Sequence, residues 1–146
     1  MPELSVRVEV AAPPEQSWAA LTDWARQREW MLGTTVHASS GTGHSVGDEL
    51  RAVTGIGRVG MVERMRITRW DPPRVCEVLH EGRIVRGPGT FAVESRGRGS
   101  LVIWAEDLDL PLGALGRLGW PLVRPFARWG LQRSLHRFAR WAPAYS

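Results

Sequence analysis

The sequence contains one cysteine, Cys76, and no lysine or asparagine, so all 19 basic residues are arginine. One cysteine cannot form a disulfide within the chain, which excludes the disulfide-stapled class of small secreted domain and fits a reducing compartment. No stretch approaches the roughly 20 uninterrupted apolar residues of a transmembrane helix. The N-terminal MPELSVRVEV alternates where a signal peptide needs a continuous apolar core. These absences predict a cytoplasmic protein.

Acidic residues are missing from the C-terminal part of the chain. Residues 110 to 146 contain six arginines and no Asp or Glu, whereas residues 1 to 109 contain 13 arginines and 15 acids. The formal net charge is +4, and the excess positive charge therefore lies at the C-terminal end. Arginines interleaved with Phe126 and Trp129 suit a nucleic-acid surface, a membrane surface or the solvated side of a helix.

The 146 residues, 43% of them hydrophobic, are enough to close one hydrophobic core without metals or disulfides. No repeat or low-complexity segment interrupts them, so we expect one ordered domain over residues 1–146. Residues 4–10 alternate apolar and polar side chains, which is typical of a half-buried strand. Pro13 and Pro14 suit the first turn of a helix, and the spacing in EQSWAALTDWARQREWM predicts two short helices in quick succession.

Six further segments of eight to eleven residues mostly alternate and are separated by Gly, Ser or Asp-Pro-Pro. They span residues 34–41, 47–55, 60–70, 75–85, 89–97 and 100–110. With the first strand they predict an antiparallel sheet of about seven strands. Such a sheet needs a cover for its apolar face, because a bare face would be prone to aggregation.

The C-terminal segment is the remaining candidate for that cover. One of its faces is apolar at helical spacing and comprises Ala127, Leu131, Leu135, Phe138 and Ala142. Pro121 and Pro125 predict an irregular or kinked lead-in, with a regular helix that begins at about residue 122 or 126 and ends at about Trp141. Because the helix is needed over the sheet and the net charge is modest, we do not expect nucleic-acid binding. Peripheral membrane contact stays open as a less favoured alternative.

Two short motifs favour loops over active sites. GHSVG at 43–47 matches the G-x-S-x-G nucleophile elbow, and GIGRVG at 55–60 matches the G-x-G-x-x-G dinucleotide fingerprint. Both precede a predicted strand where those motifs need a helix, so we interpret them as a hairpin loop and a β-turn. The four histidines lack the spacing of a zinc site. We expect no metal and no cofactor.

Three segments carry a family resemblance: VRVEVAAPPEQSWAALTDWARQREWM at 6–31, ERMRITRWDPPRV at 63–75 and SLVIWAEDLDLPLG at 100–113. In these segments and in its element order the chain resembles the START-like superfamily, also called birch-pollen-allergen-like or SRPBCC, and within it the polyketide cyclase/dehydrase and lipid transport family. The resemblance covers nearly the whole chain. It implies an α+β helix-grip fold, in which a curved antiparallel sheet of about seven strands wraps a long C-terminal helix, with two short helices after the first strand.

The resemblance also implies a cavity between sheet and helix that holds an apolar or aromatic ligand, with the Gly- and Pro-rich residues 111–125 as a mobile gate near its mouth. Alternation along the strands and the helix predicts which side chains face it. The ligand-binding candidates are Trp24, Trp30, Met61, Met65, Val78, Trp104, Leu131 and Leu135. The titratable candidates are His80, Glu63 and Glu106. An apolar cavity favours the neutral forms of such groups, which suits proton transfer near pH 7.

Two classes of function follow. The first is a protein that binds a hydrophobic small molecule, such as a lipid, a polyketide or an isoprenoid. The second is a small cyclase, aromatase or dehydrase in which His80, Glu63 or Glu106 transfers protons to and from a folded polyketide. A role on a protein partner or a membrane surface is the less favoured third. The sequence is compatible with a monomer or a homodimer.

Overall fold

The computed structural model describes residues 3–56, 59–82, 85–109 and 113–146. The helices are α1 (Pro14–Leu21), the 3-10 helix η1 (Trp24–Glu29), α2 (Ala114–Trp141) and the 3-10 helix η2 (Ala142–Ala144). The strands are β1 (Glu3–Val10), β2 (Thr34–Ala38), β3 (Glu49–Ile56), β4 (Val59–Asp71), β5 (Val75–Glu81), β6 (Arg86–Arg96) and β7 (Gly99–Asp107). This order confirms the predicted strand, two short helices, six strands and long helix.

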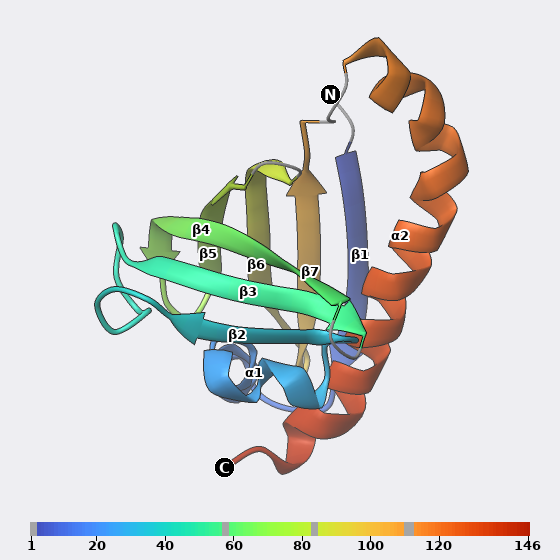
Figure 1. Ribbon diagram of the computed structural model, residues 1–146. Helices are drawn as coiled ribbons and strands as arrows, with labels where there is room; N and C mark the ends of the chain where they lie inside the picture. Colours follow the sequence, from blue (N-terminus) through green and yellow to red (C-terminus); the bar gives the residue numbers. More distant parts are fainter. Residues whose placement is uncertain (1–2, 57–58, 83–84, 110–112) are drawn as a thin grey trace.

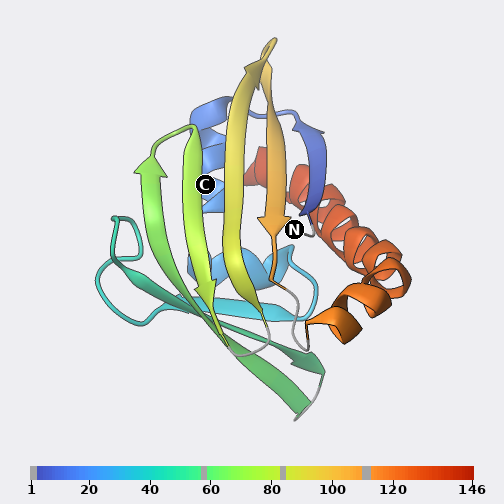
Figure 2. The same ribbon diagram turned by 90° about the horizontal axis from the view of Figure 1, so that it is seen from above.

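The strands form one antiparallel sheet in the order β1-β7-β6-β5-β4-β3-β2. Figures 1 and 2 show the sheet curving around its concave side, with α1 and η1 closing one end and α2 running along the open side beside β1. The predicted helix-grip fold is therefore confirmed. No helix in the described part of the chain is long and apolar enough to cross a membrane.

The core lies where α1, η1 and the C-terminal part of α2 meet the sheet. Trp30, just after η1, and Phe138 of α2 are fully buried, with ring centroids 5.0 Å apart. Leu21 and Leu135 are fully buried in the same cluster. Rings of this size bury enough apolar surface to dominate the stability of the fold.

Helix α2 corrects one prediction. It begins at Ala114 instead of at residue 122 or 126, and Pro121 and Pro125 lie inside it. Each proline removes one backbone hydrogen bond, because it has no N–H to donate to the carbonyl four residues earlier. Residues 117 and 121, which carry these carbonyls, are exposed, so water can take the place of the missing donor. Figure 1 shows the helix bent in this half, as a kinked lead-in predicts.

A β-bulge in β4 decides which side chains face inward at one end of the sheet. The register with β5 shifts between Ile67 and Arg69. Ile67 is fully buried. Because the bulge adds one residue to the strand, the next side chain to pack inward is Trp70, which contacts Trp18, whereas Arg69 is exposed. The residues before the bulge keep the strict alternation from which the cavity candidates were predicted.

The described residues of the two discounted motifs lie in a loop and at the ends of strands. Residues 43–47 belong to the loop between β2 and β3, as predicted. Residues 55–60 join β3 to β4, which are antiparallel neighbours, and residues 57 and 58 of this motif lie outside the described residues. Neither segment precedes a helix, which the nucleophile elbow and the dinucleotide fingerprint both require.

Candidate functional site

A cavity of about 460 Å³ lies between the concave side of the sheet and the middle of α2. Most of its wall is apolar, and it includes six of the eight predicted ligand-binding residues: Trp24, Met61, Met65, Val78, Trp104 and Leu131. All three predicted titratable residues, Glu63, His80 and Glu106, also line it. The alternation of β4, β5 and β7 therefore brings the predicted side chains to one space.

Trp30 and Leu135 do not line this cavity, contrary to prediction. Both are fully buried beside it, Trp30 between Phe91, Trp104 and Phe138 and Leu135 in the same core cluster. Helical spacing places Leu131 and Leu135 on one face of α2, but the space between helix and sheet is filled at the level of Leu135 and hollow at that of Leu131. The sequence pattern does not distinguish these two levels.

His80 and Glu106 form a hydrogen-bonded pair inside the cavity. The His80 Nε2 to Glu106 Oε2 distance is 2.9 Å, and the His80 side chain is only 8% exposed. The Trp104 indole donates to the other carboxylate oxygen, Oε1, at 2.9 Å. Both oxygens of Glu106 are thus held in place, which fixes the carboxylate against the imidazole.

Gly89 makes this pair geometrically feasible. His80 is on β5 and Glu106 on β7, so the two side chains must reach each other across β6, which lies between those strands. Gly89 of β6 pairs with Glu106 in the sheet register. A Cβ added at Gly89 would lie 2.5 Å from Glu106 Oε2 and 2.8 Å from His80 Nε2. The missing side chain leaves the space in which the pair forms.

Glu63 extends the polar cluster on the neighbouring strand. In the register of β4 with β5, Met65 pairs with His80, and Glu63 is two residues from Met65 on the same face. Burial raises the pKa of Glu63; the nearby His80 lowers it and the charge of Glu106 raises it again, so that the net shift is upward. Glu63 is consequently a stronger base than an ordinary surface carboxylate.

The imidazole of His80 is subject to opposing influences. Burial is the largest and lowers the pKa of His80, whereas the hydrogen bond to Glu106 and the charges of Glu106 and Glu63 raise it. The net shift is upward, so the carboxylates favour the protonated ring relative to a free imidazole. His80 Nδ1 is buried and has no hydrogen-bond partner within the described residues.

The described residues of the cavity wall offer little support for thiol-based or metal-dependent chemistry. Cys76 lines it, but burial raises the pKa of the thiol to about 12, so little nucleophilic thiolate exists at neutral pH. Over the described ranges, no group of three or more His, Cys, Asp or Glu side chains is arranged to hold a metal ion. The groups available for chemistry are therefore the two carboxylates and the imidazole.

Several residues of the site escaped sequence reasoning. Phe91 and Gly89 follow the alternation of β6 into the cavity, but a glycine carries no side chain that would mark it as part of a site. Trp120, Ala127 and Gly130 contribute the α2 wall. The signal for Trp120 is its helical spacing from Ala127, which was missed because Pro121 and Pro125 predicted an irregular lead-in before the regular helix.

Comparison with known families agrees with this architecture. The family model described as polyketide cyclase / dehydrase and lipid transport matches residues 1–142. The chain belongs to this family. A search of the curated proteins finds no match.

Solved structures share the fold at low sequence identity. TTHA0849 from Thermus thermophilus is 17% identical, with a TM-score of 0.78 and a match over 98% of each chain. The Zhui aromatase/cyclase from Streptomyces sp. R1128 is 17% identical, with a TM-score of 0.73 over 97% of this chain and 93% of that chain. Ara h 8.0201 is 11% identical, with a TM-score of 0.69 over 98% of each chain. At such identities the likeness shows the fold alone.

Proposed function

We propose that this protein binds a mostly apolar small molecule in the cavity between the sheet and α2. The cavity itself carries the proposal: its volume of about 460 Å³ lies within the range of roughly 300 to 1,000 Å³ found for small-molecule sites. Its wall is apolar apart from a few polar groups, which is the usual composition of such sites. A lipid, a polyketide or an isoprenoid fits this chemistry.

The polar cluster gives the ligand an orientation. Glu63, His80 and Glu106 are all on the sheet wall, whereas the α2 residues that line the cavity carry no charge. A wholly apolar ligand would remove water from this cluster without replacing its hydrogen bonds, which is costly. The preferred ligand therefore carries a hydroxyl or carbonyl group that lies against the sheet, with its apolar body against α2.

Two glycines of α2 provide a matched test. Gly130 lines the cavity and Gly119 does not, yet a Cβ added at either would meet nothing within 4 Å. Gly130→Trp should fill the cavity and weaken the binding of a naphthalene-sulfonate probe by about tenfold or more, equivalent to about 1.4 kcal/mol. Gly119→Trp should bind the probe like the unmodified protein. Fluorescence titration measures both, with circular dichroism as a control for folding.

Equal probe binding by the two tryptophan variants would refute the assignment of the ligand to this cavity. Native mass spectrometry of protein purified from its own host supplies a second measurement. A stoichiometric apolar compound that is retained by the Gly119→Trp protein and lost from the Gly130→Trp protein would identify the ligand.

Cyclase or dehydrase chemistry is a second candidate, favoured by the His80–Glu106 pair beside Glu63. Glu63, as carboxylate, would remove a proton from the carbon next to a substrate carbonyl. His80, held as imidazolium by Glu106, would donate its proton to the β-hydroxyl, which leaves as water while the new carbon–carbon double bond forms. The upward pKa shifts of both groups suit these roles, because one must be a good base and the other must stay protonated.

This chemistry is tested with an aromatic β-hydroxyketone, whose elimination is followed by ultraviolet absorbance. Glu63→Gln and His80→Gln should each reduce kcat by about a hundredfold or more while probe binding is retained. His44→Gln, which changes an exposed histidine outside the cavity, is the control. Turnover that survives both cavity substitutions would remove the catalytic role and leave the binding role standing.

A further inference from the structure

Helix α2 is apolar on two opposite faces, and the cavity accounts for only one of them. The second face is a row of large side chains at steps of three or four residues, here called the outer stripe: Leu115, Leu118, Leu122, Phe126 and Trp129. These side chains are 65% to 76% exposed. Exposed apolar residues that gather into one row mark an interaction surface more often than isolated ones do.

The outer stripe faces away from the ligand cavity. At 3.6 residues per turn, Leu122 and Phe126 lie on the side of the helix roughly opposite Trp120 and Leu131, which line the cavity. The core of the protein lies further along the helix, where Ser134, Leu135 and Phe138 are its buried residues. Nothing in the described part of the chain covers the outer stripe.

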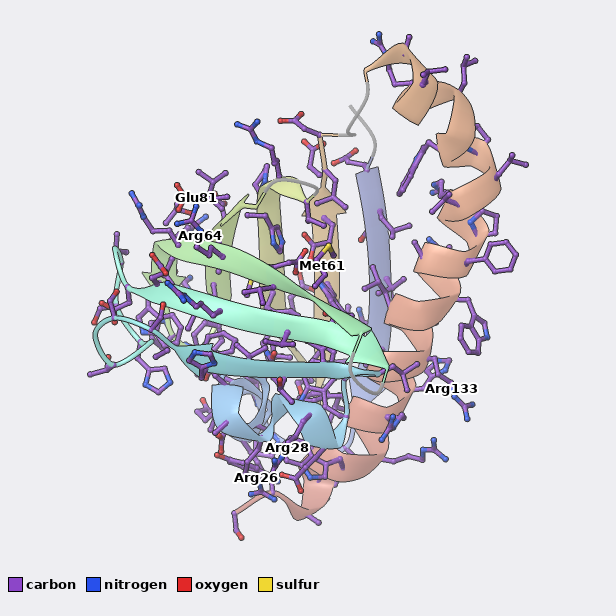
Figure 3. All side chains as sticks on the ribbon, in the orientation of Figure 1. Arg26, Arg28, Met61, Arg64, Glu81 and Arg133 are labelled. Carbon is purple, nitrogen blue, oxygen red and sulfur yellow. The ribbon has the colours of Figure 1, made fainter. Side chains whose placement is uncertain are left out.

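Arginines accompany the outer stripe. Arg133 continues its line one turn beyond Trp129 on the outer side of α2 (Figure 3), and Arg140, seven residues further on, falls on the same line. Residues 110–146 contain no acidic residue to neutralise them. A helix that presents Leu, Phe and Trp on one side and carries arginines but no acid elsewhere has the composition of helices that lie in the interface of a bilayer.

The charges of α2 distinguish between two possible partners for the outer stripe, a second copy of the protein and a bilayer. A second copy that packed its own outer stripe here would bring the arginines of two helices together without any acid from either helix between them, which is unfavourable. An anionic bilayer supplies both missing partners, an apolar layer for the stripe and phosphate groups for the arginines.

We propose that the outer stripe of α2 docks the protein on an anionic lipid bilayer, with its apolar side chains in the interfacial layer and its arginines on the lipid phosphates. The inference is independent of the proposed function, because it uses the opposite face of the helix. It also places the cavity next to a source of apolar molecules.

Flotation with vesicles of phosphatidylglycerol and phosphatidylcholine tests the apolar half of the proposal. The triple variant Leu118→Ser, Phe126→Ser, Trp129→Ser should partition about tenfold or more weakly than the unmodified protein. A double variant Val46→Ser, Val62→Ser is the control, since both residues are exposed and lie outside α2. It should float like the unmodified protein.

The contribution of the arginines is tested with Arg133→Gln, Arg140→Gln, both of which are exposed. Each arginine near an anionic surface contributes about a fivefold factor, so the double variant should bind about 25-fold more weakly. Arg64→Gln, Arg98→Gln loses the same charge from exposed positions on β4 and in the turn between β6 and β7, and should bind normally; Figure 3 shows Arg64 on the strands, well away from α2. Raising the salt concentration should release the unmodified protein.

Binding that is as strong to pure phosphatidylcholine as to anionic vesicles would overturn the proposal, as would the triple variant floating normally. A vesicle-free dimer in analytical ultracentrifugation that the triple variant converts to a monomer would assign the stripe to a second copy instead. Probe binding in the cavity, measured without vesicles, separates these outcomes from a failure of the proposed function.

Discussion

The space between the sheet and α2 is filled at one end and hollow at the other. At the filled end, Trp30, Leu135 and Phe138 belong to the core cluster and have no solvent exposure. Hydrogen bonds also tie this end together: the Gln16 side chain donates to the Ala142 carbonyl at 2.9 Å, and the Tyr145 hydroxyl donates to Asp23 at 2.8 Å. At the hollow end, the same helix and the same sheet enclose a cavity.

The part of α2 at the filled end and the part at the hollow end also differ in composition. Residues 131–141 contain no Gly or Pro, whereas residues 114–130 contain three glycines and two prolines. In the described part of the chain, α2 makes no side-chain hydrogen bond to the sheet before Arg128, which donates to the Ser5 carbonyl at 3.0 Å. We therefore expect stability to be concentrated at the filled end and the wall of the cavity to open more easily.

Two leucines one turn apart should show the largest difference. Leu135→Ala removes a fully buried side chain from the filled end and should lower the free energy of unfolding by about 2 to 5 kcal/mol. Leu131→Ala, at the cavity wall, should cost about 1 kcal/mol, because one side of this leucine already faces empty space. Urea denaturation measures both. Similar losses would show that the cavity is filled in solution.

Amide hydrogen exchange compares the two parts of α2 directly. We expect faster exchange in residues 114–130 than in 131–141, since the former have fewer packing contacts and poorer helix formers. Pro121→Ala, Pro125→Ala should slow exchange in 114–130 by restoring two backbone hydrogen bonds, with a gain of up to about 3 kcal/mol per site in the free energy of opening. Uniform protection from exchange along α2 of the unmodified protein would contradict the expected difference between its two parts.

A smaller gain in stability is expected from a substitution at Gly119. Gly119→Ala should stabilise the protein by about 0.5 to 1 kcal/mol, because alanine loses less backbone freedom in a helix and its Cβ has open space. Gly97, at φ +58°, is the contrasting position, since a Cβ there is strained whatever the space around it. Thermal unfolding should show an increase in Tm for Gly119→Ala and a decrease for Gly97→Ala.

The polar cluster at the hollow end should make the stability of the protein depend on pH. The pKa values of Glu63 and His80 are both raised in the folded protein, so the folded state binds more protons than the unfolded state over their titration range. Their contribution to stability is present at acidic pH and is lost as pH rises through the raised values. Denaturation between pH 5 and pH 9 should show stability falling with pH, and Glu63→Gln, His80→Gln should flatten the fall. A steeper fall in the variant would contradict the assigned shifts.

Much of the site could be predicted from local alternation. Met61, Glu63 and Met65 share a face in the sequence and line the cavity in the structure, because a strand without a bulge sends every second side chain to the same side. The partner of His80 could not be predicted this way. Glu106 is 26 residues away on a strand that does not adjoin β5, and the contact depends on the missing side chain of Gly89 between them.

What the sequence determined by itself was the set of elements and the apolar face of each, since side-chain periodicity and Gly or Pro punctuation act over a few residues. Tertiary structure alone decided which apolar positions would be filled core, cavity wall or exposed surface. Leu135, Leu131 and Leu122 are chemically identical residues of one helix, and they occupy those three environments in turn. The difference arises from the curvature of the sheet, which closes on the C-terminal end of α2 and diverges from the rest, and curvature is set by the pairing of strands that are distant in the chain.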